Sequence, residues 1–190
     1  PQVPKTSSIV VVGTVAFDSI ETPFGKSDRI IGGAATYISL AASYFNKNIN
    51  LISVVGGDFP KEQILLMNAR GVKTEGLQII EDEKSFFWKG SYHLDMNTRD
   101  TLITDLNVLA GFDPKVPESY QDCDYLMLGN LTPTIQTTVI NRLRHRPKLI
   151  VLDTMNFWMD SAMEKLKELG VESRGMTPEE VDTYLKAEYK

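Results

Sequence analysis

The sequence predicts an α/β protein in which helices cover both faces of a doubly wound, mainly parallel sheet, with a small antiparallel β lid inserted into the fold. Continuous apolar runs, typical of strands buried on both faces, occur at residues 9–12, 50–55, 125–128 and 149–152. Helical patterns lie between these runs, and that alternation favours a parallel sheet. Shorter amphipathic strand patterns, typical of an antiparallel sheet with one open face, occur at 77–80, 85–92 and 100–105.

Five segments have the composition and spacing of helices: 34–45, 60–70, 134–143, 158–169 and 177–189. The second of these has Pro60 in its first turn and Gly71 where a C-terminal cap belongs. The fourth has an apolar stripe made of Met159, Met163, Leu166 and Leu169. In the last, Thr177 and Glu180 have the spacing of a capping box.

The charge balance argues against a surface for polyanions. The 190 residues have a formal net charge of −5 and a pI near 5.1, whereas nucleic-acid binding draws on clustered Lys and Arg. The single cysteine, Cys123, excludes an internal disulfide, fits a reducing compartment and indicates no metal site. No apolar stretch has the length of a membrane span, and residues 1–8 lack a secretory pattern. We therefore expect a cytoplasmic protein that binds neither nucleic acid nor membrane.

Three short segments lie where ligands bind in open parallel sheets, beyond the carboxyl ends of the strands. Asp18 follows the first strand, Gly32 and Gly33 precede the helix at 34–45, and residues 153–156 follow the strand at 149–152. A carboxylate there can accept hydrogen bonds from the hydroxyls of a polyol. A double glycine lets the backbone approach a ligand closely. The residues leave a second interpretation open, in which Asp18 is a turn residue and the glycines satisfy a tight turn.

The joint pattern resembles a known family. Residues 32–42 (GGAATYISLAA) and 52–58 (ISVVGGD) are similar to the N-terminal signature region of PfkB-type, ribokinase-like kinases. The opening at 12–18 and the segment DTMN at 153–156 fit the same order. The resemblance covers roughly residues 8–165. It implies an enzyme family that uses ATP and Mg²⁺ to transfer the γ-phosphate to a hydroxyl of a sugar or nucleoside.

The resemblance also assigns roles to individual residues. It implies that Asp18 binds substrate hydroxyls and that the substrate lies against the backbone at Gly32 and Gly33. Further substrate contacts are expected at Tyr37, Phe87 and Asn156. The family's lid over the sugar corresponds to residues 21–31 and 77–105. We expect a domain at 1–170 and a helical tail of uncertain origin at 171–190, with four lid aromatics as candidates for stacking on substrate: Phe86, Phe87, Trp88 and Tyr92.

Two departures from the family pattern limit what the resemblance implies. Many members have Asn at the position of Tyr37, which puts ribose in question as a substrate. Members also continue with an Asn-x-x-Glu motif and a glycine-rich anion hole that ends in the catalytic Asp, and neither occurs here. By elimination, the remaining candidate for a catalytic base is Asp58. The plainer interpretation of Asp58 is an N-cap for the helix that begins near Pro60.

Two classes of function therefore remain. The first is the substrate-binding portion of a PfkB-type kinase, inactive alone because the half that binds ATP and forms the anion hole is absent. The second is a non-catalytic or engineered α/β binding or scaffold protein. A nicotinamide dehydrogenase is disfavoured because no G-x-G-x-x-G follows the first strand. We also expect a homodimer through the β lid, and a sheet that ends at residues 149–152 with an unpaired edge unless the C-terminal segment or another chain covers it.

Overall fold

In the computed structural model, which describes residues 7–174, five parallel strands form the main sheet in the order β5-β4-β1-β8-β9. The strands are β1 (Ile9–Val12), β4 (Ile49–Gly56), β5 (Val72–Ile80), β8 (Tyr125–Leu128) and β9 (Leu149–Leu152). Strand β1 lies between β4 and β8, with Val10 opposite Asn50 and Leu126. The predicted parallel sheet is confirmed.

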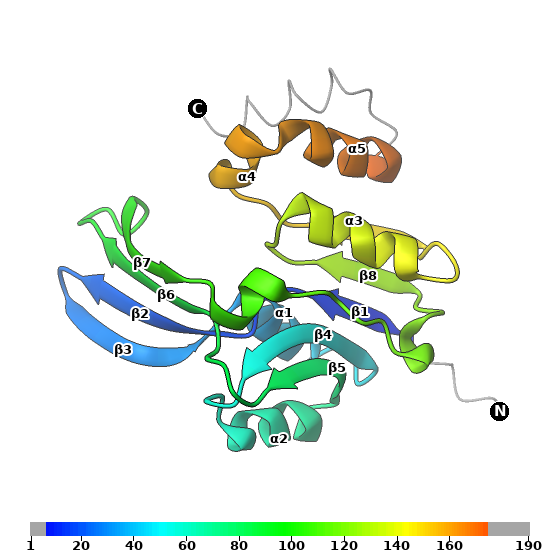
Figure 1. Cartoon of the computed structure of the whole chain (residues 1–190), viewed down its shortest axis with the longest axis horizontal. Coiled ribbons are helices and arrows are strands. Elements are labelled where there is room, and N and C mark those ends of the chain that lie inside the picture. Colours follow the sequence, from blue (N-terminus) through cyan, green and yellow to red (C-terminus); the bar gives the residue numbers. More distant parts are fainter. Residues whose placement is uncertain (1–6, 175–190) are drawn as a thin grey trace.

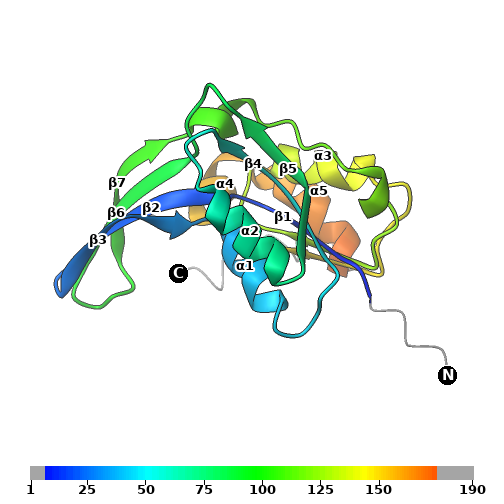
Figure 2. The ribbon, with the colours of Figure 1, turned by 90° about the horizontal axis from the view of Figure 1, so that it is seen from below.

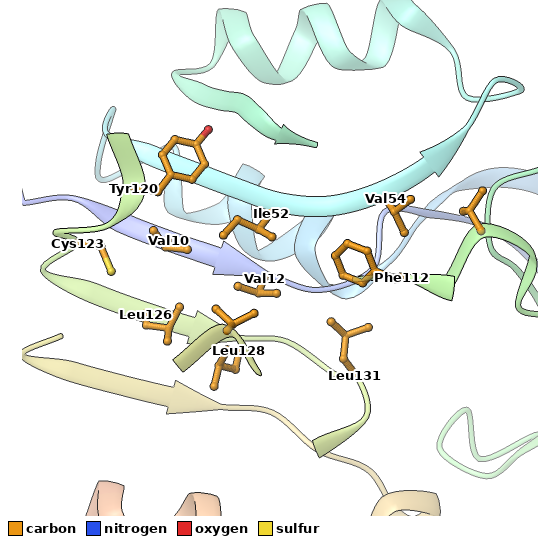
Figure 3. Close-up of a cluster of buried hydrophobic side chains, with 12 residues drawn as sticks. Val10, Val12, Ile52, Val54, Phe112, Tyr120, Cys123, Leu126, Leu128 and Leu131 are labelled. Atoms are coloured by element: carbon orange, nitrogen blue, oxygen red, sulfur yellow. The ribbon is translucent and has the colours of Figure 1, made fainter. Parts of the chain in front are cut away.

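Helices cover both faces of this sheet, as the doubly wound prediction requires. Helices α1 (Ala34–Ala42) and α2 (Lys61–Ala69) lie on one face, and α3 (Pro133–Arg142) and α5 (Met163–Arg174) on the other (Figure 1). The first core lies on the side of α1 and α2 and includes Val11 of β1. The second core lies on the side of α3 and includes Val10 and Val12. The second core also includes residues from β8 and from two 3₁₀ helices, η1 (Asn107–Gly111) and η2 (Glu118–Tyr120) (Figure 3). Burial on both sides explains why β1 is apolar at every position.

A second sheet of four strands, here named the lid sheet, projects beyond the carboxyl ends of the main strands (Figures 1 and 2). It contains β2 (Ala16–Thr22), β3 (Gly25–Gly32), β6 (Phe87–Tyr92) and β7 (Arg99–Asp105), in the order β3-β2-β6-β7. The prediction of an antiparallel lid is wrong for one pair, because β2 and β6 are parallel. Strand β2 follows β1 and strand β6 follows β5, so both leave the same edge of the main sheet in the same direction.

One predicted lid strand belongs to the main sheet. Residues 77–80 form the end of β5, which pairs in parallel with β4 along 72–80. The residues that face the core are Val72, Gly76 and Leu77, whereas Lys73 and Glu75 are exposed. An edge strand of a parallel sheet has few buried positions, so it need not be a continuous apolar run. For this reason the sequence pattern did not predict the first half of β5.

The C-terminal part of the described chain differs from the sequence prediction at two points. The expected helix at 158–169 is divided into α4 (Asn156–Ser161) and α5, separated by Ala162. Helix α5 continues through Arg174, past the expected domain boundary at 170. The helix expected at 177–189 lies outside the described residues. Within residues 7–174, β9 is an edge strand of the main sheet, as predicted for 149–152, and Leu149 is 52% exposed.

None of the helices described within residues 7–174 is long and apolar enough to cross a membrane.

Candidate substrate site

The candidate site is centred on Asp18, which lies within β2 where the lid sheet leaves the main sheet. Asp18 is therefore a strand residue and not part of a turn. It is opposite Ile30 of β3 and Trp88 of β6 in the lid register, and it is half-buried. A methyl group built on Gly32 would overlap the Asp18 carboxylate, so glycine leaves room for this side chain in its present position. The first glycine of the pair thus makes space for the carboxylate.

The second glycine supports a tight connection into α1. Gly33 has a φ of 95°, a conformation that L side chains rarely adopt, and a Cβ there would overlap the carbonyl of Thr14. The Thr14 hydroxyl accepts a hydrogen bond from the Ala34 N–H at 3.0 Å, and its carbonyl accepts from the Ala35 N–H at 2.9 Å. Thr14 therefore holds the first turn of α1 beside the start of β2.

The electrostatics of Asp18 reflect this position. Burial raises the pKa of the Asp18 carboxyl above its usual value, and a hydrogen bond from the Gly33 N–H partly offsets that rise. A half-buried carboxylate with one N–H donor still has free lone pairs, which can accept hydrogen bonds from hydroxyl groups. The arrangement suits a neutral ligand with several hydroxyls.

A second carboxylate, Asp153, lies at the carboxyl end of β9, on the same edge of the main sheet. Desolvation raises the pKa of the Asp153 carboxyl, and N–H groups of Thr154 and Asn130 partly offset this. Its backbone is held at both ends: the N–H donates to the Leu128 carbonyl at 2.8 Å, and the carbonyl accepts from Gln136 Nε2 at 3.0 Å. Residues 153–156 therefore directly follow the strand that ends at Leu152, as the sequence predicted.

The other predicted contact residues have different surroundings. The Tyr37 hydroxyl donates to the Ile31 carbonyl at 3.1 Å, which places its ring beside the Gly32–Gly33 turn, and the residue is 58% exposed. Phe87 is opposite Phe17 in the lid and packs with it against the first core. Asn156 begins α4, and its side chain lies outside the described part of the chain. The structure therefore groups Asp18, Gly32, Gly33 and Tyr37, whereas Phe87 lies on the core side of the lid sheet.

Asp58 has a structural role that neither sequence interpretation anticipated. Its Oδ1 accepts hydrogen bonds from the N–H and hydroxyl of Ser85 at 2.8 and 2.7 Å, and its Oδ2 pairs with Arg29 Nη2 at 2.6 Å. The N-cap prediction is wrong, because the cap of α2 is Pro60 and no side chain bonds there. Desolvation raises the pKa of Asp58, but the hydrogen bonds from Ser85 and Arg29 outweigh it and lower the pKa overall. Such a carboxylate is a weak base.

The contacts of Asp58 join the lid sheet to the main sheet. Arg29 belongs to β3, and Ser85 immediately precedes the segment that leads into β6. The Arg29 guanidinium also lies 4.1 Å from the centre of the Phe17 ring, a cation–π contact. Ser85 is 1% exposed, and its hydroxyl accepts from the Gly56 N–H at 3.0 Å. Asp58 therefore anchors both β hairpins of the lid at their base.

The glycines before Asp58 do not form a phosphate site. A Cβ on Gly56 would overlap the carbonyl of Glu83, and one on Gly57 would overlap that of Glu81. These glycines thus allow the backbone of residues 81–85 to pack closely against the end of β4. Within residues 7–174, no group of three or more His, Cys, Asp or Glu side chains could hold a metal ion. Among residues 7–174, the ATP and Mg²⁺ that the resemblance implied therefore have no site identified by these two observations.

Arg29 and Ser85 were missed by sequence reasoning. Both act through contacts with a residue from another strand or loop, and no local motif marks such pairs. The features that distinguish Arg29 appear only in the structure: it has a φ of 46° and lies opposite an irregularity between Asp18 and Ile20 in the pairing of β2 with β3.

Comparisons with known proteins show which proteins share this fold. The sequence is 27% identical over 136 residues to a cytidine kinase from Thermococcus kodakarensis, covering 72% of this chain and 48% of that protein. The structure resembles a ribokinase from Cryptococcus neoformans var. grubii solved with ADP (TM-score 0.65, 17% identity, 84% of this chain and 53% of that one). It also resembles a Burkholderia thailandensis nucleoside kinase solved with inosine (TM-score 0.62, 16% identity, 92% and 65%). No family model matches the sequence.

This chain covers only part of the length of each of these relatives. The chain spans about half the length of the curated cytidine kinase and 53% to 65% of the two kinase structures. The chain therefore has the ribokinase-like fold of the PfkB sugar and nucleoside kinases.

Proposed function

We propose that this chain is the substrate-binding portion of a PfkB-type kinase, a protein that transfers the γ-phosphate of ATP to a hydroxyl of a sugar or nucleoside. In this proposal Asp18 accepts hydrogen bonds from hydroxyls of the acceptor. The backbone at Gly32 and Gly33, together with Tyr37, borders the bound molecule. Asn156 provides a further contact from the start of α4.

The observation that carries the proposal is the half-buried Asp18 carboxylate at the base of the lid sheet. Gly32 leaves room for it and the Gly33 N–H orients it, yet no cation pairs with it among the contacts of residues 7–174. A carboxylate kept partly away from water without a cationic partner is energetically unfavourable. Hydroxyl donors from a ligand would relieve that cost. The likeness to a cytidine kinase and to nucleoside kinase and ribokinase structures supports this class of ligand.

We further propose that these 190 residues bind the acceptor without phosphorylating it. Phosphoryl transfer needs donors arranged around the transferred group, a metal ion and a base beside the accepting hydroxyl. The described residues offer the acceptor side through Asp18, whereas Asp58 is engaged by Ser85 and Arg29. Loss of oxyanion-type donors alone lowers rates by about 10²- to 10³-fold. Binding without turnover is the expected behaviour.

A coupled ADP-release assay with ATP, Mg²⁺ and a panel of sugars and nucleosides tests this expectation. We expect no substrate-dependent ADP release above background, while calorimetry detects binding of at least one panel member. Turnover of about one per second would be at the lower end of kinase rates. Such turnover, abolished by Asp58→Asn, would contradict the proposal. Absence of both binding and turnover would favour the alternative, a non-catalytic scaffold.

We also propose that the chain forms a homodimer through its lid sheet. Every residue of the edge strand β7 is exposed, including Leu102 (50%) and Ile103 (42%). An exposed edge with apolar side chains is a site for pairing with a second chain. The four lid aromatics, Phe86, Phe87, Trp88 and Tyr92, are partly covered. The apolar residues of β7 are therefore the better candidates for contact.

Substitution of a charge into β7 should separate the dimer. We expect Ile103→Glu to sediment as a monomer at concentrations where the unmodified chain is a dimer. Leu65→Glu is the matched control, because Leu65 is 67% exposed on α2, away from the lid sheet. An unmodified chain that remains monomeric at high micromolar concentration would refute the proposed interface.

A further inference from the structure

The pairing of β2 with β3 contains a β-bulge directly beside Asp18. Between two regular pairs, β2 has a single residue, Ser19, whereas β3 has two, Asp28 and Arg29. An extra residue in one strand of an antiparallel pair bends that strand and can redirect neighbouring side chains. Arg29 has a φ of 46°, which is uncommon for a residue other than glycine. The bulge therefore has a strained backbone and needs contacts that hold it.

The hydroxyl of Ser19 supplies those contacts. It donates to Oδ1 of Asp28 at 2.6 Å and accepts from the N–H of Arg29 at 2.9 Å, so it bonds both of the residues that face it. Ser19 is 2% exposed. A bulge leaves its extra residue outside the regular ladder, and here the Ser19 hydroxyl satisfies the freed N–H. Ser19 thus stabilises the bulge from the neighbouring strand.

The bulge reconciles two registers that differ by one residue. At the turn of the hairpin, Thr22 is opposite Gly25. In a regular antiparallel ladder each step back along β2 is matched by one step forward along β3, so a ladder continued from that pair would place Arg29 opposite Asp18. In the structure the residue opposite Asp18 is Ile30. The extra residue therefore shifts β3 by one position between its turn and its base.

The shift keeps a cation away from Asp18. The guanidinium of Arg29 lies 4.1 Å from the centre of the Phe17 ring and pairs with Asp58. Successive residues of a strand point to opposite faces, so Phe17 and Asp18 occupy opposite faces of the lid sheet. Arg29 therefore lies on the face away from Asp18. In the regular ladder these two residues would be directly opposite, with Cβ atoms about 5 Å apart, and an ion pair would occupy the carboxylate.

We propose that Ser19 is a positioning residue, which holds β3 in the register that separates Arg29 from Asp18 and leaves the carboxylate free for a ligand. This inference rests on the proposed function of Asp18. The same register places Gly32 on the face of Asp18, where the carboxylate takes up the space that a side chain would fill. A regular ladder from the turn would place the branched Ile31 there. Ser19 therefore acts on the site through the backbone of β3.

The test measures the binding of cytidine, inosine and ribose by calorimetry, using the full 190-residue chain. Ser19→Ala removes both hydrogen bonds, and we expect it to weaken binding by roughly 10-fold, because the bulged register is then less populated. Ser19→Thr keeps a hydroxyl and should recover most of the affinity. Arg29→Gly, added to Ser19→Ala, should also restore binding, since glycine adopts a positive φ without strain and carries no cation.

A double-mutant cycle shows whether the effect passes through Asp18. Ser19→Ala should cause little further loss when it is added to Asp18→Asn, because the charge that Arg29 would capture is already absent. An equal loss in both backgrounds would show that Ser19 only stabilises the fold, and would overturn the inference. Equal affinity of Ser19→Ala and the unmodified chain would overturn it too, and would leave the role of Asp18 intact.

NMR titration of the Asp18 carboxyl carbon tests the register without any ligand. Burial raises the pKa of Asp18 in the unmodified chain, whereas an Arg29 guanidinium opposite it would lower that pKa. We expect the Asp18 carboxyl of Ser19→Ala to titrate at a lower pH than that of the unmodified chain, and an unchanged pKa would overturn the positioning role. If cytidine, inosine and ribose all fail to bind the unmodified chain, the proposed function of Asp18 is wrong, and a lowered pKa would still support the register.

Discussion

Asp18→Asn should abolish most of the affinity for a hydroxyl-bearing ligand. Hydrogen bonds to a charged group contribute about 1.5–3 kcal/mol each, so loss of the charge should weaken binding by roughly 10- to 150-fold. Asparagine retains the size of the side chain, and Gly32 still leaves room for it. Calorimetric titration of a ligand that binds the unmodified chain measures the effect. Equal affinity in the variant would remove Asp18 from the site.

The pH dependence of the same binding provides an internal control. Burial raises the pKa of Asp18, with a partial offset from the Gly33 N–H. We therefore expect ligand affinity to fall on acidification while the pH is still above the ordinary Asp value, as the carboxylate gains a proton. The affinity of Asp18→Asn should not change over this range. A parallel pH profile in both proteins would assign the titration to another group.

Ionisation of Asp18 should favour ligand binding but lower the stability of the folded chain. A raised folded-state pKa means that the protonated form is favoured by folding, so this contribution is present below the unfolded pKa and is lost as pH rises through the raised value. At neutral pH the ionised Asp18 therefore disfavours the folded state. Asp18→Asn should leave the free energy of unfolding unchanged or slightly increased, while it removes binding. That separation distinguishes a ligand-binding residue from a structural one.

Asp58→Ala should destabilise the protein and loosen the base of the lid sheet. The substitution leaves the buried N–H and hydroxyl of Ser85 without their acceptor, and an unsatisfied buried donor costs about 1–3 kcal/mol. The pair with Arg29 adds little, because an exposed ion pair contributes about 0–1 kcal/mol and Arg29 is about half exposed. We expect a loss near 2 kcal/mol in denaturant unfolding, together with faster amide exchange in β3 and β6.

Two further variants separate the contacts of Asp58. Arg29→Met removes the ion pair but keeps an apolar chain near Phe17, and it should have a smaller effect than Asp58→Ala. Asp58→Asn keeps an acceptor for Ser85 and should lie between the two. If Arg29→Met is as destabilising as Asp58→Ala, the anchoring role assigned to Ser85 is wrong.

The pH dependence of the Asp58 contribution has the usual sign for a paired carboxylate. Its pKa is lowered in the folded state, because the hydrogen bonds from Ser85 and Arg29 outweigh the effect of desolvation. The stabilisation is therefore present above the unfolded value, near 4, and is lost as pH falls through the lowered pKa. The difference in unfolding free energy between the unmodified chain and Asp58→Ala should shrink below about pH 4.

The sequence by itself determined the main sheet and the position of the central carboxylate. Residues Val10, Val11 and Val12 are apolar on both faces of β1, and that is the pattern of a strand covered by helices on both sides. The two glycines before α1 also marked a special backbone position. Gly33 has a φ that favours glycine, and Gly32 leaves room for the Asp18 side chain. These features depend on local sterics and on periodicity, which a sequence displays directly.

Only the tertiary structure decided which residues share a face or a contact with Asp18. The choice between Phe87 and Trp88 depends on the register of β2 with β6, and a shift of one residue would exchange their faces. Strand β5 was misassigned in its first half because pairing with β4, and not its own pattern, places it in the main sheet. Asp58 acquired its role through partners 27 and 29 residues away in sequence. Contacts of this kind arise when separate strands are brought together, and local propensity carries no record of which side chains will then meet.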